Sequence, residues 1–163
     1  MLRSLSLIFL SLFSANTKAD DICPGVDPPI FDYFISCPPL ICDNARCLIM
    51  DYQCWSEKSD RYTHECGQLA IMYLEEISRL QDETIDKVNA AKRDFYLCVN
   101  SAPFNRSACQ QAYCLNVKQI YISAEAENVH IRSIYEQTMQ TLREQICSEI
   151  LQECCKPIFP PIY

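Results

Sequence analysis

The stretch from residue 59 to residue 155 constrains the fold most, because almost nothing in it can stop a helix. It contains a single proline, Pro103, and a single glycine, Gly67. On both sides of Pro103, apolar residues recur every three or four positions, which is the pattern of amphipathic helices that pack on each other. The first stripe comprises Cys66, Leu69, Tyr73, Ile77, Leu80, Thr84, Val88, Ala91, Phe95 and Cys98. The second comprises Cys114, Val117, Ile120, Ala124, Asn128, Ile131, Tyr135, Thr138, Leu142, Ile146, Ile150 and Cys154.

The pattern predicts two long helices, over residues 59–100 and 107–155. Ser59 or Asp60 can cap the first, and Ser107 followed by Gln110 is a capping-box pattern for the second. At 1.5 Å per residue the helices would be roughly 60 and 73 Å long. Isolated amphipathic helices are unstable, so the two must pack together, and their short connection makes them an antiparallel hairpin.

The twelve cysteines predict disulfides that fix the register of this hairpin. In an antiparallel pair of helices, the residue numbers of facing positions have a constant sum. That sum is 212 for Cys98 with Cys114 and 213 for Cys66 with Cys147, so both pairs fit one register. The rival pair Cys98–Cys109 gives 207 and leaves Cys66 without a well-placed partner. The pairs Cys98–Cys114 and Cys66–Cys147 are therefore preferred.

The N-terminal part of the mature chain is predicted to be an extended strap followed by a short helix. Residues 20–39 hold five of the nine prolines, which favours the strap. The short helix spans residues 40–57, and its apolar face would pack on the hairpin. That face comprises Ile41, Ala45, Leu48, Ile49, Tyr52 and Trp55. The fold class is thus all-α, a disulfide-stapled helical hairpin with a third short helix, a proline-rich strap and a tail over residues 157–163.

The remaining cysteines are predicted to tie the strap and the short helix to the hairpin. Along an extended strap, Cys23 reaches the level of Cys109, which makes that pair a third tie. The adjacent Cys154 and Cys155 point in different directions on a helix, so they need two partners. The nearest candidates are Cys54 and Cys47. Disulfides are also expected for Cys37 and Cys42.

Residues 1–19 have the organisation of a secretory signal peptide. A basic Arg3 precedes the apolar run 5–13, and cleavage is expected after Ala19 or Ala15. The apolar run is too short to span a bilayer, and no later stretch approaches that length. Residues 20–163 are therefore predicted to form one cysteine-rich helical domain that is secreted and extracellular.

The charge of the mature chain excludes some partners. Without Arg3 and Lys18 the 14 basic residues become 12, which against 21 acidic residues gives a net charge of −9. Nucleic acid and anionic membranes are poor partners for such a chain. No Cys-x-x-Cys motif occurs, so neither a structural zinc site nor a thioredoxin-type pair is expected. The sequence predicts no cofactor.

Two histidine motifs are weak signals for catalysis. The pair His64 and Glu65 is similar to the histidine–acid pair of secreted phospholipase A2, but that enzyme needs a glycine-rich calcium loop. This chain has only two glycines. Glu127 and His130 have the spacing of a di-iron ligand pair, but the motif occurs once where such a site needs it twice. We therefore expect a protein that is not an enzyme.

The connection between the two long helices carries the other candidate features. Asn105-Arg106-Ser107 is the only N-glycosylation sequon, and its place in a loop favours use of Asn105. The aromatic residues Phe95, Tyr96 and Phe104 lie near the same loop and predict a binding face. The strap, a second copy in a homodimer, or a partner protein would cover that face.

Two functions follow as hypotheses. The first is a secreted, non-enzymatic protein that binds an extracellular protein or receptor, as a signal, a surface-recognition factor or a venom component. The second is an extracellular carrier of a small apolar ligand between the helices, which requires an enclosed cavity of about 300 Å³ or more.

Overall fold

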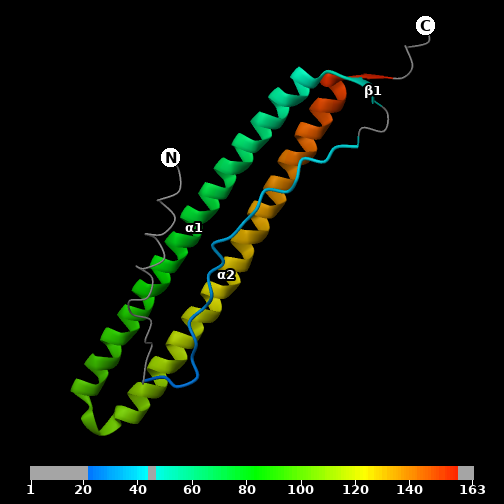
Figure 1. The fold of residues 1–163 in the computed structure, drawn as a ribbon. Helices are drawn as coiled ribbons and strands as arrows, with labels where there is room; N and C mark the ends of the chain where they lie inside the picture. The colour runs from blue at the N-terminus through cyan, green and yellow to red at the C-terminus, as the bar shows by residue number, and fades with distance from the viewer. Residues whose placement is uncertain (1–21, 44–46, 158–163) are drawn as a thin grey trace. The chain divides into compact units, whose positions relative to one another are not determined.

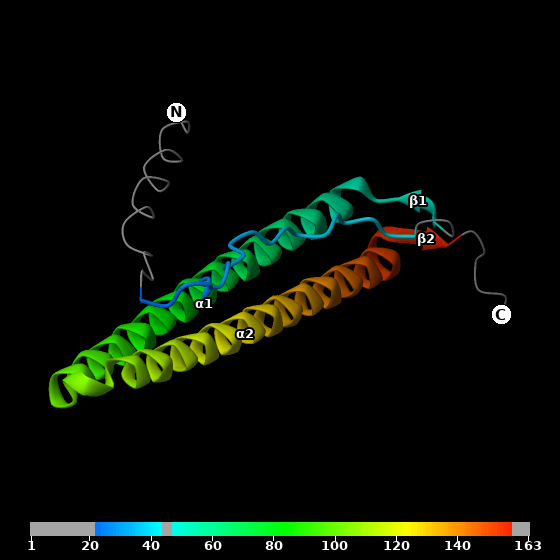
Figure 2. The ribbon, with the colours of Figure 1, turned by 90° about the horizontal axis from the view of Figure 1, so that it is seen from below.

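The computed structural model describes residues 22–43 and 47–157. The predicted signal peptide and all but the first residue of the predicted tail lie outside these ranges. In chain order the elements are β1 (Cys47–Met50), α1 (Tyr52–Ser101), the 3₁₀ helix η2 (Pro103–Asn105), α2 (Arg106–Glu149), the π-helix η3 (Ile150–Cys154) and β2 (Cys155–Pro157) (Figure 1). The chain is mostly helical, and the two long helices that the sequence predicts pack against each other (Figure 2).

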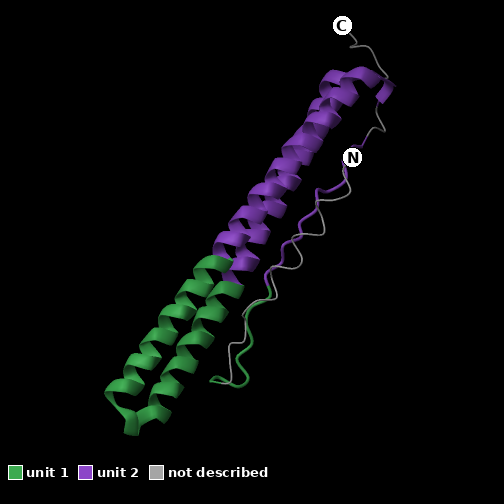
Figure 3. Ribbon diagram, turned by 60° about the vertical axis from the view of Figure 1, so that its left-hand side comes forward, with its two compact units in different colours: residues 1–30, 81–125 green, residues 31–80, 126–163 purple. Residues whose placement is uncertain are grey.

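The chain divides into two compact units, and each unit contains part of both long helices (Figure 3). Unit 1 comprises Met1–Ile30 and Gln81–Glu125. Unit 2 comprises Phe31–Leu80 and Ala126–Tyr163. Each unit has its own hydrophobic core.

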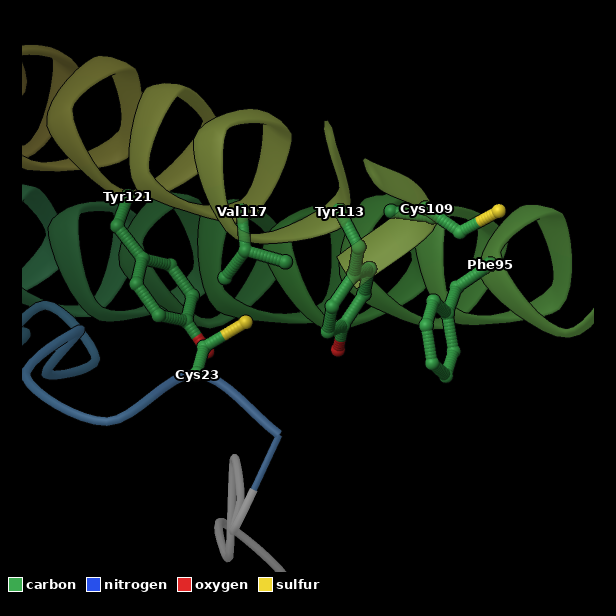
Figure 4. Close-up of a cluster of buried hydrophobic side chains, with 7 residues drawn as sticks. Cys23, Phe95, Cys109, Tyr113, Val117 and Tyr121 are labelled. Atoms are coloured by element: carbon green, nitrogen blue, oxygen red, sulfur yellow. The ribbon is translucent and has the colours of Figure 1, made fainter. Parts of the chain in front are cut away.

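The core of unit 1 is aromatic. Phe95 of α1 packs on Tyr113 of α2, with 5.4 Å between the ring centroids. Figure 4 shows this cluster, with Cys23 of the N-terminal segment (residues 22–43) beside Tyr121. Two disulfides close it, Cys98–Cys109 between the helices and Cys23–Cys114 from the N-terminal segment to α2.

The core of unit 2 is built from the facing stripes of α1 and α2 together with residues 31–43, which contain no helix or strand. Tyr73 packs edge-on against Tyr135, and its hydroxyl donates to the carbonyl oxygen of Asp32 (2.5 Å). The hydroxyl of Tyr62 likewise donates to the carbonyl oxygen of Pro38. The carboxylate of Asp32 also pairs with Arg132. These contacts explain why tyrosines, which bring a polar end to an apolar ring, occupy core positions here.

The predicted short helix over residues 40–57 is wrong. Its described part forms β1 and the start of α1, which begins at Tyr52 instead of residue 59. The carboxylate of Asp51 accepts hydrogen bonds from the N–H groups of Gln53 (3.1 Å) and Cys54 (3.2 Å). Asp51 is therefore the N-cap of α1, in place of Ser59 or Asp60. The second helix begins close to the prediction, at Arg106.

The structure joins all twelve cysteines in six disulfides, and it corrects the predicted pairing. The pairs Cys98–Cys114, Cys66–Cys147 and Cys23–Cys109 are wrong, while the assignment of Cys54 and Cys47 to Cys154 and Cys155 is confirmed. The six pairs are Cys23–Cys114, Cys37–Cys66, Cys42–Cys147, Cys47–Cys155, Cys54–Cys154 and Cys98–Cys109.

The physical reason for the error is the register of the helices. Facing positions sum to 207 at Cys98–Cys109 in unit 1 and to 208 at Tyr73 and Tyr135 in unit 2. In this register, Cys66 and Cys147 are not opposite each other. The N-terminal segment supplies their partners, Cys37 and Cys42.

Candidate functional site

The ribbon formed by β1 and β2 in unit 2 presents apolar side chains to solvent. The strands pair antiparallel, with Cys47 opposite Pro157 and Ile49 opposite Lys156, so Leu48 is an extra residue in a β-bulge. A bulge interrupts the alternation of side chains between the two faces of a ribbon. As a result two consecutive residues are exposed, Leu48 at 61% and Ile49 at 56%.

The first turn of α1 continues this apolar surface. Tyr52 is 79% exposed and Trp55 is 37% exposed. Residues three apart lie on the same side of a helix, so these two positions share one face of α1. We call Leu48, Ile49, Tyr52 and Trp55 the ribbon surface. Single exposed apolar residues are ordinary, so four large ones within one short segment are the candidate site for an interaction.

Two disulfides and a backbone hydrogen bond fix the backbone of the ribbon surface. The disulfides Cys47–Cys155 and Cys54–Cys154 bracket it on both sides. Between them, the N–H of Asp51 donates to the carbonyl oxygen of Cys154 (2.8 Å). A backbone fixed in this way loses little conformational entropy when a partner binds to it.

A cluster of charges lies one turn further along α1. Lys58 Nζ contacts Glu149 Oε2 (2.9 Å) and Glu153 Oε2 (2.7 Å), and Arg61 Nη2 contacts Glu149 Oε2 (2.6 Å). The hydrogen bond from Lys58, followed by those from Gln145 and Arg61, lowers the pKa of Glu149 to about 2. The bond to Glu153, and then that to Glu149, raises the pKa of Lys58. The four groups neutralise one another and tie α1 to the end of α2.

The sequence pattern pointed to these residues but assigned them the opposite role. Ile41, Leu48, Ile49, Tyr52 and Trp55 were expected to form the buried face of the short helix, and the structure exposes all five. Ala45, the sixth member of that face, lies outside the described residues. The N-cap at Asp51 was the available signal, because an aspartate there ends β1 and starts α1 in the middle of the expected helix.

The predicted binding face in unit 1 is only partly available. The ring of Phe95 is buried, at 7% exposure, and packs between Tyr113 and Tyr96. Tyr96 is half exposed, while Phe104 is fully exposed in η2. Asn105, the predicted glycosylation site, is also exposed there. The structure therefore leaves Tyr96 and Phe104 exposed, while Phe95 belongs to the core of unit 1.

An open groove in unit 2, with a volume of about 540 Å³, lies between α1 and α2. Its lining residues are His64, Glu65, Gln68, Leu69, Thr138, Thr141, Leu142 and Gln145. The hydroxyls of Thr138 and Thr141 donate to the carbonyl oxygens of Ile134 (2.8 Å) and Gln137 (2.9 Å). These hydroxyls are thus engaged by their own helix instead of being directed at His64.

Within residues 22–43 and 47–157, no group of three or more His, Cys, Asp or Glu side chains could hold a metal ion. No helix there is long and apolar enough to cross a membrane.

Comparison with known proteins gives no assignment. No family model matches this chain, and the searches of curated proteins and of solved structures also returned no match.

Proposed function

We propose that this chain is an extracellular, non-enzymatic protein that binds another protein through the ribbon surface. The observation that carries the proposal is the exposure of Leu48, Ile49, Tyr52 and Trp55 on a segment fixed by two disulfides. The six disulfides and the signal-peptide pattern of residues 1–19 support an extracellular location, because disulfides form and persist in oxidising compartments.

The composition of the ribbon surface suits a protein partner. Tyrosine and tryptophan are the residues that most often dominate binding energy at protein interfaces. Burying a fully exposed large apolar side chain contributes about 1.5–3 kcal/mol. Two aromatic and two aliphatic anchors would therefore offset a substantial part of the cost of association.

The ribbon also offers backbone groups. In the described residues the sheet has two strands, so β1 and β2 each have an outer edge. An extended segment of a partner can add to such an edge by main-chain hydrogen bonds, while its side chains contact Leu48 and Ile49.

The alternative function, a carrier of a small apolar ligand, ranks second. The groove between α1 and α2 exceeds the volume that such a ligand needs, but it is open to solvent. Ligand sites usually bury most of the ligand surface. A small apolar molecule in this groove would keep much of its surface in water, which favours the protein-binding hypothesis.

Binding by variants tests the proposal. Tyr52→Asp places a charge in the ribbon surface, and Leu115→Asp places one at a comparably exposed position of α2 in unit 1. The oxidised proteins would be immobilised and used to capture partners from extracellular fluid and cell-surface extracts of the organism that makes the protein. Captured proteins would be compared by quantitative mass spectrometry.

The expected result is a partner that wild type and Leu115→Asp retain and Tyr52→Asp loses. Circular dichroism and disulfide mapping would establish that all three proteins share one fold. Equal capture by Tyr52→Asp and wild type, or capture of nothing by any of them, would count against the ribbon surface as the binding site.

A further inference from the structure

The connection between α1 and α2 contains two consecutive exposed residues, Phe104 and Asn105. The 3₁₀ helix η2 (Pro103–Asn105) contains no buried residue, and Phe104 within it is 104% exposed. Asn105 and Ser107 are exposed as well. Leaving this ring in water forgoes about 1.5–3 kcal/mol of burial, which a covering group would recover.

The conformation of this connection is set by groups other than the Asn105 side chain. The N–H of Asn105 donates to the carbonyl oxygen of Ala102, and the N–H of Ala102 donates to the carbonyl oxygen of Cys98 (both 2.9 Å). The disulfide Cys98–Cys109 closes the two helix ends around the turn. The carboxamide of Asn105 is therefore free to carry a bulky group without loss of a contact that holds the fold.

We propose that Asn105 carries an N-linked glycan whose first sugar covers the ring of Phe104. Asn105-Arg106-Ser107 has the acceptor pattern for this modification. The inference rests on the proposed extracellular route, since the donor is met only by exported chains. In the transfer, the amide nitrogen of Asn105 bonds to C1 of a lipid diphosphate-linked oligosaccharide and loses a proton. The bond from C1 to the diphosphate breaks, and the lipid diphosphate leaves.

Covering Phe104 accounts for its position next to the acceptor. A pyranose has one face made largely of C–H groups, and a glycan on Asn105 begins one residue away from the exposed ring. Contact between that face and the ring would remove apolar surface from water, while the hydroxyl groups of the sugar stay hydrated. A bare Phe104 would instead be a site for unwanted association.

Mass spectrometry of secreted protein tests the modification. The full chain with its leader would be expressed in a eukaryotic cell line as wild type, Asn105→Gln, Ser107→Ala and Ser107→Thr. The expected glycan mass is present on wild type and on Ser107→Thr, and absent from the other two. Treatment with a peptide N-glycosidase should remove it and convert Asn105 to aspartate.

The failures are distinguishable. A secreted wild-type protein with an unmodified Asn105 would overturn this inference and leave the proposed extracellular role intact. A chain that stays in the cytosol, unmodified, would overturn both.

Dye binding tests the covering of the ring. Removing the glycan should raise the fluorescence of a hydrophobic-surface dye for wild type and for the control Leu115→Ser, and should leave Phe104→Ser unchanged. An equal rise in Phe104→Ser would overturn the contact between sugar and ring.

Discussion

The backbone N–H of Asp51 donates a hydrogen bond to the carbonyl oxygen of Cys154 over 2.8 Å. This bond joins the start of α1 to the end of η3 in unit 2, while the side chain of Asp51 caps α1. One residue therefore ends β1, begins a helix of 50 residues and holds the ribbon surface against the second helix.

The first prediction concerns the cap. Asp51→Ala should lower the free energy of unfolding by about 1 kcal/mol, because the N–H groups of Gln53 and Cys54 lose their acceptor. Asp51→Asn, whose side chain caps equally well, should change it little. Urea unfolding of the oxidised proteins measures both. Equal losses in the two variants would show that charge, and not capping, is the contribution of Asp51.

The second prediction concerns Glu149 and acid. Its pKa is lowered in the folded protein to about 2, chiefly by the hydrogen bond from Lys58. A carboxylate with a lowered folded-state pKa stabilises the fold above its unfolded value and loses that contribution as the pH falls toward 2. The stability difference between wild type and Glu149→Gln should thus be constant at neutral pH and shrink as the pH falls below about 4.5.

Urea unfolding at a series of pH values from 7 to 2 provides the measurement. Glu75→Gln, which removes an exposed carboxylate from α1 in the same unit, is the matched control. Parallel curves for wild type and Glu149→Gln over the whole range would contradict the assigned role of the cluster.

The third prediction concerns the tyrosines that hold the N-terminal segment. Tyr73→Phe removes the donor to the carbonyl oxygen of Asp32, and should cost about 0.5–1.5 kcal/mol. Tyr135→Phe keeps the partly buried ring that packs edge-on against Tyr73, and should cost less. Amide hydrogen exchange should locate the loss in Tyr73→Phe to residues 31–43. Uniform loss of protection throughout unit 2 would argue against a local role.

The fourth prediction concerns the disulfides. Peptide mapping of oxidised, unreduced protein should recover Cys37 joined to Cys66 and Cys42 joined to Cys147. Such a map reads covalent bonds directly and needs no assumption about register. Recovery of a disulfide-linked peptide that joins Cys66 to Cys147 would support the pairing predicted from the sums of facing residue numbers. It would contradict the helix register of this structure.

The sequence was sufficient to predict the two long helices and most of their buried positions. Cys66, Tyr73 and Ile77 on the first stripe and Val117 and Ile131 on the second are buried as expected. The stripes are visible because the period of an α-helix repeats over many turns. Thr138 is an exception, since it is exposed and neighbouring Met139 takes the buried position.

The candidate site was not predictable in the same way. The apolar residues from Ile41 to Trp55 fit a helical period, but Asp51 and the disulfides to Cys154 and Cys155 impose a strand followed by a helix start. Those partners lie about a hundred residues away in sequence, so no local pattern reveals them. The predicted cysteine pairing was wrong for a related reason. Cys66 and Cys147 were expected to bond to each other across the two helices, but each bonds to a cysteine of the N-terminal segment.

The cysteines of the N-terminal segment also bear on what happens when the chain is cut. Cys23 is bonded to Cys114 and Cys37 is bonded to Cys66, so a single peptide bond broken between residues 23 and 37 releases no fragment. Both pieces stay attached to the helices until the sulfur bridges are reduced. A molecule nicked there would keep both pieces and both attachment points.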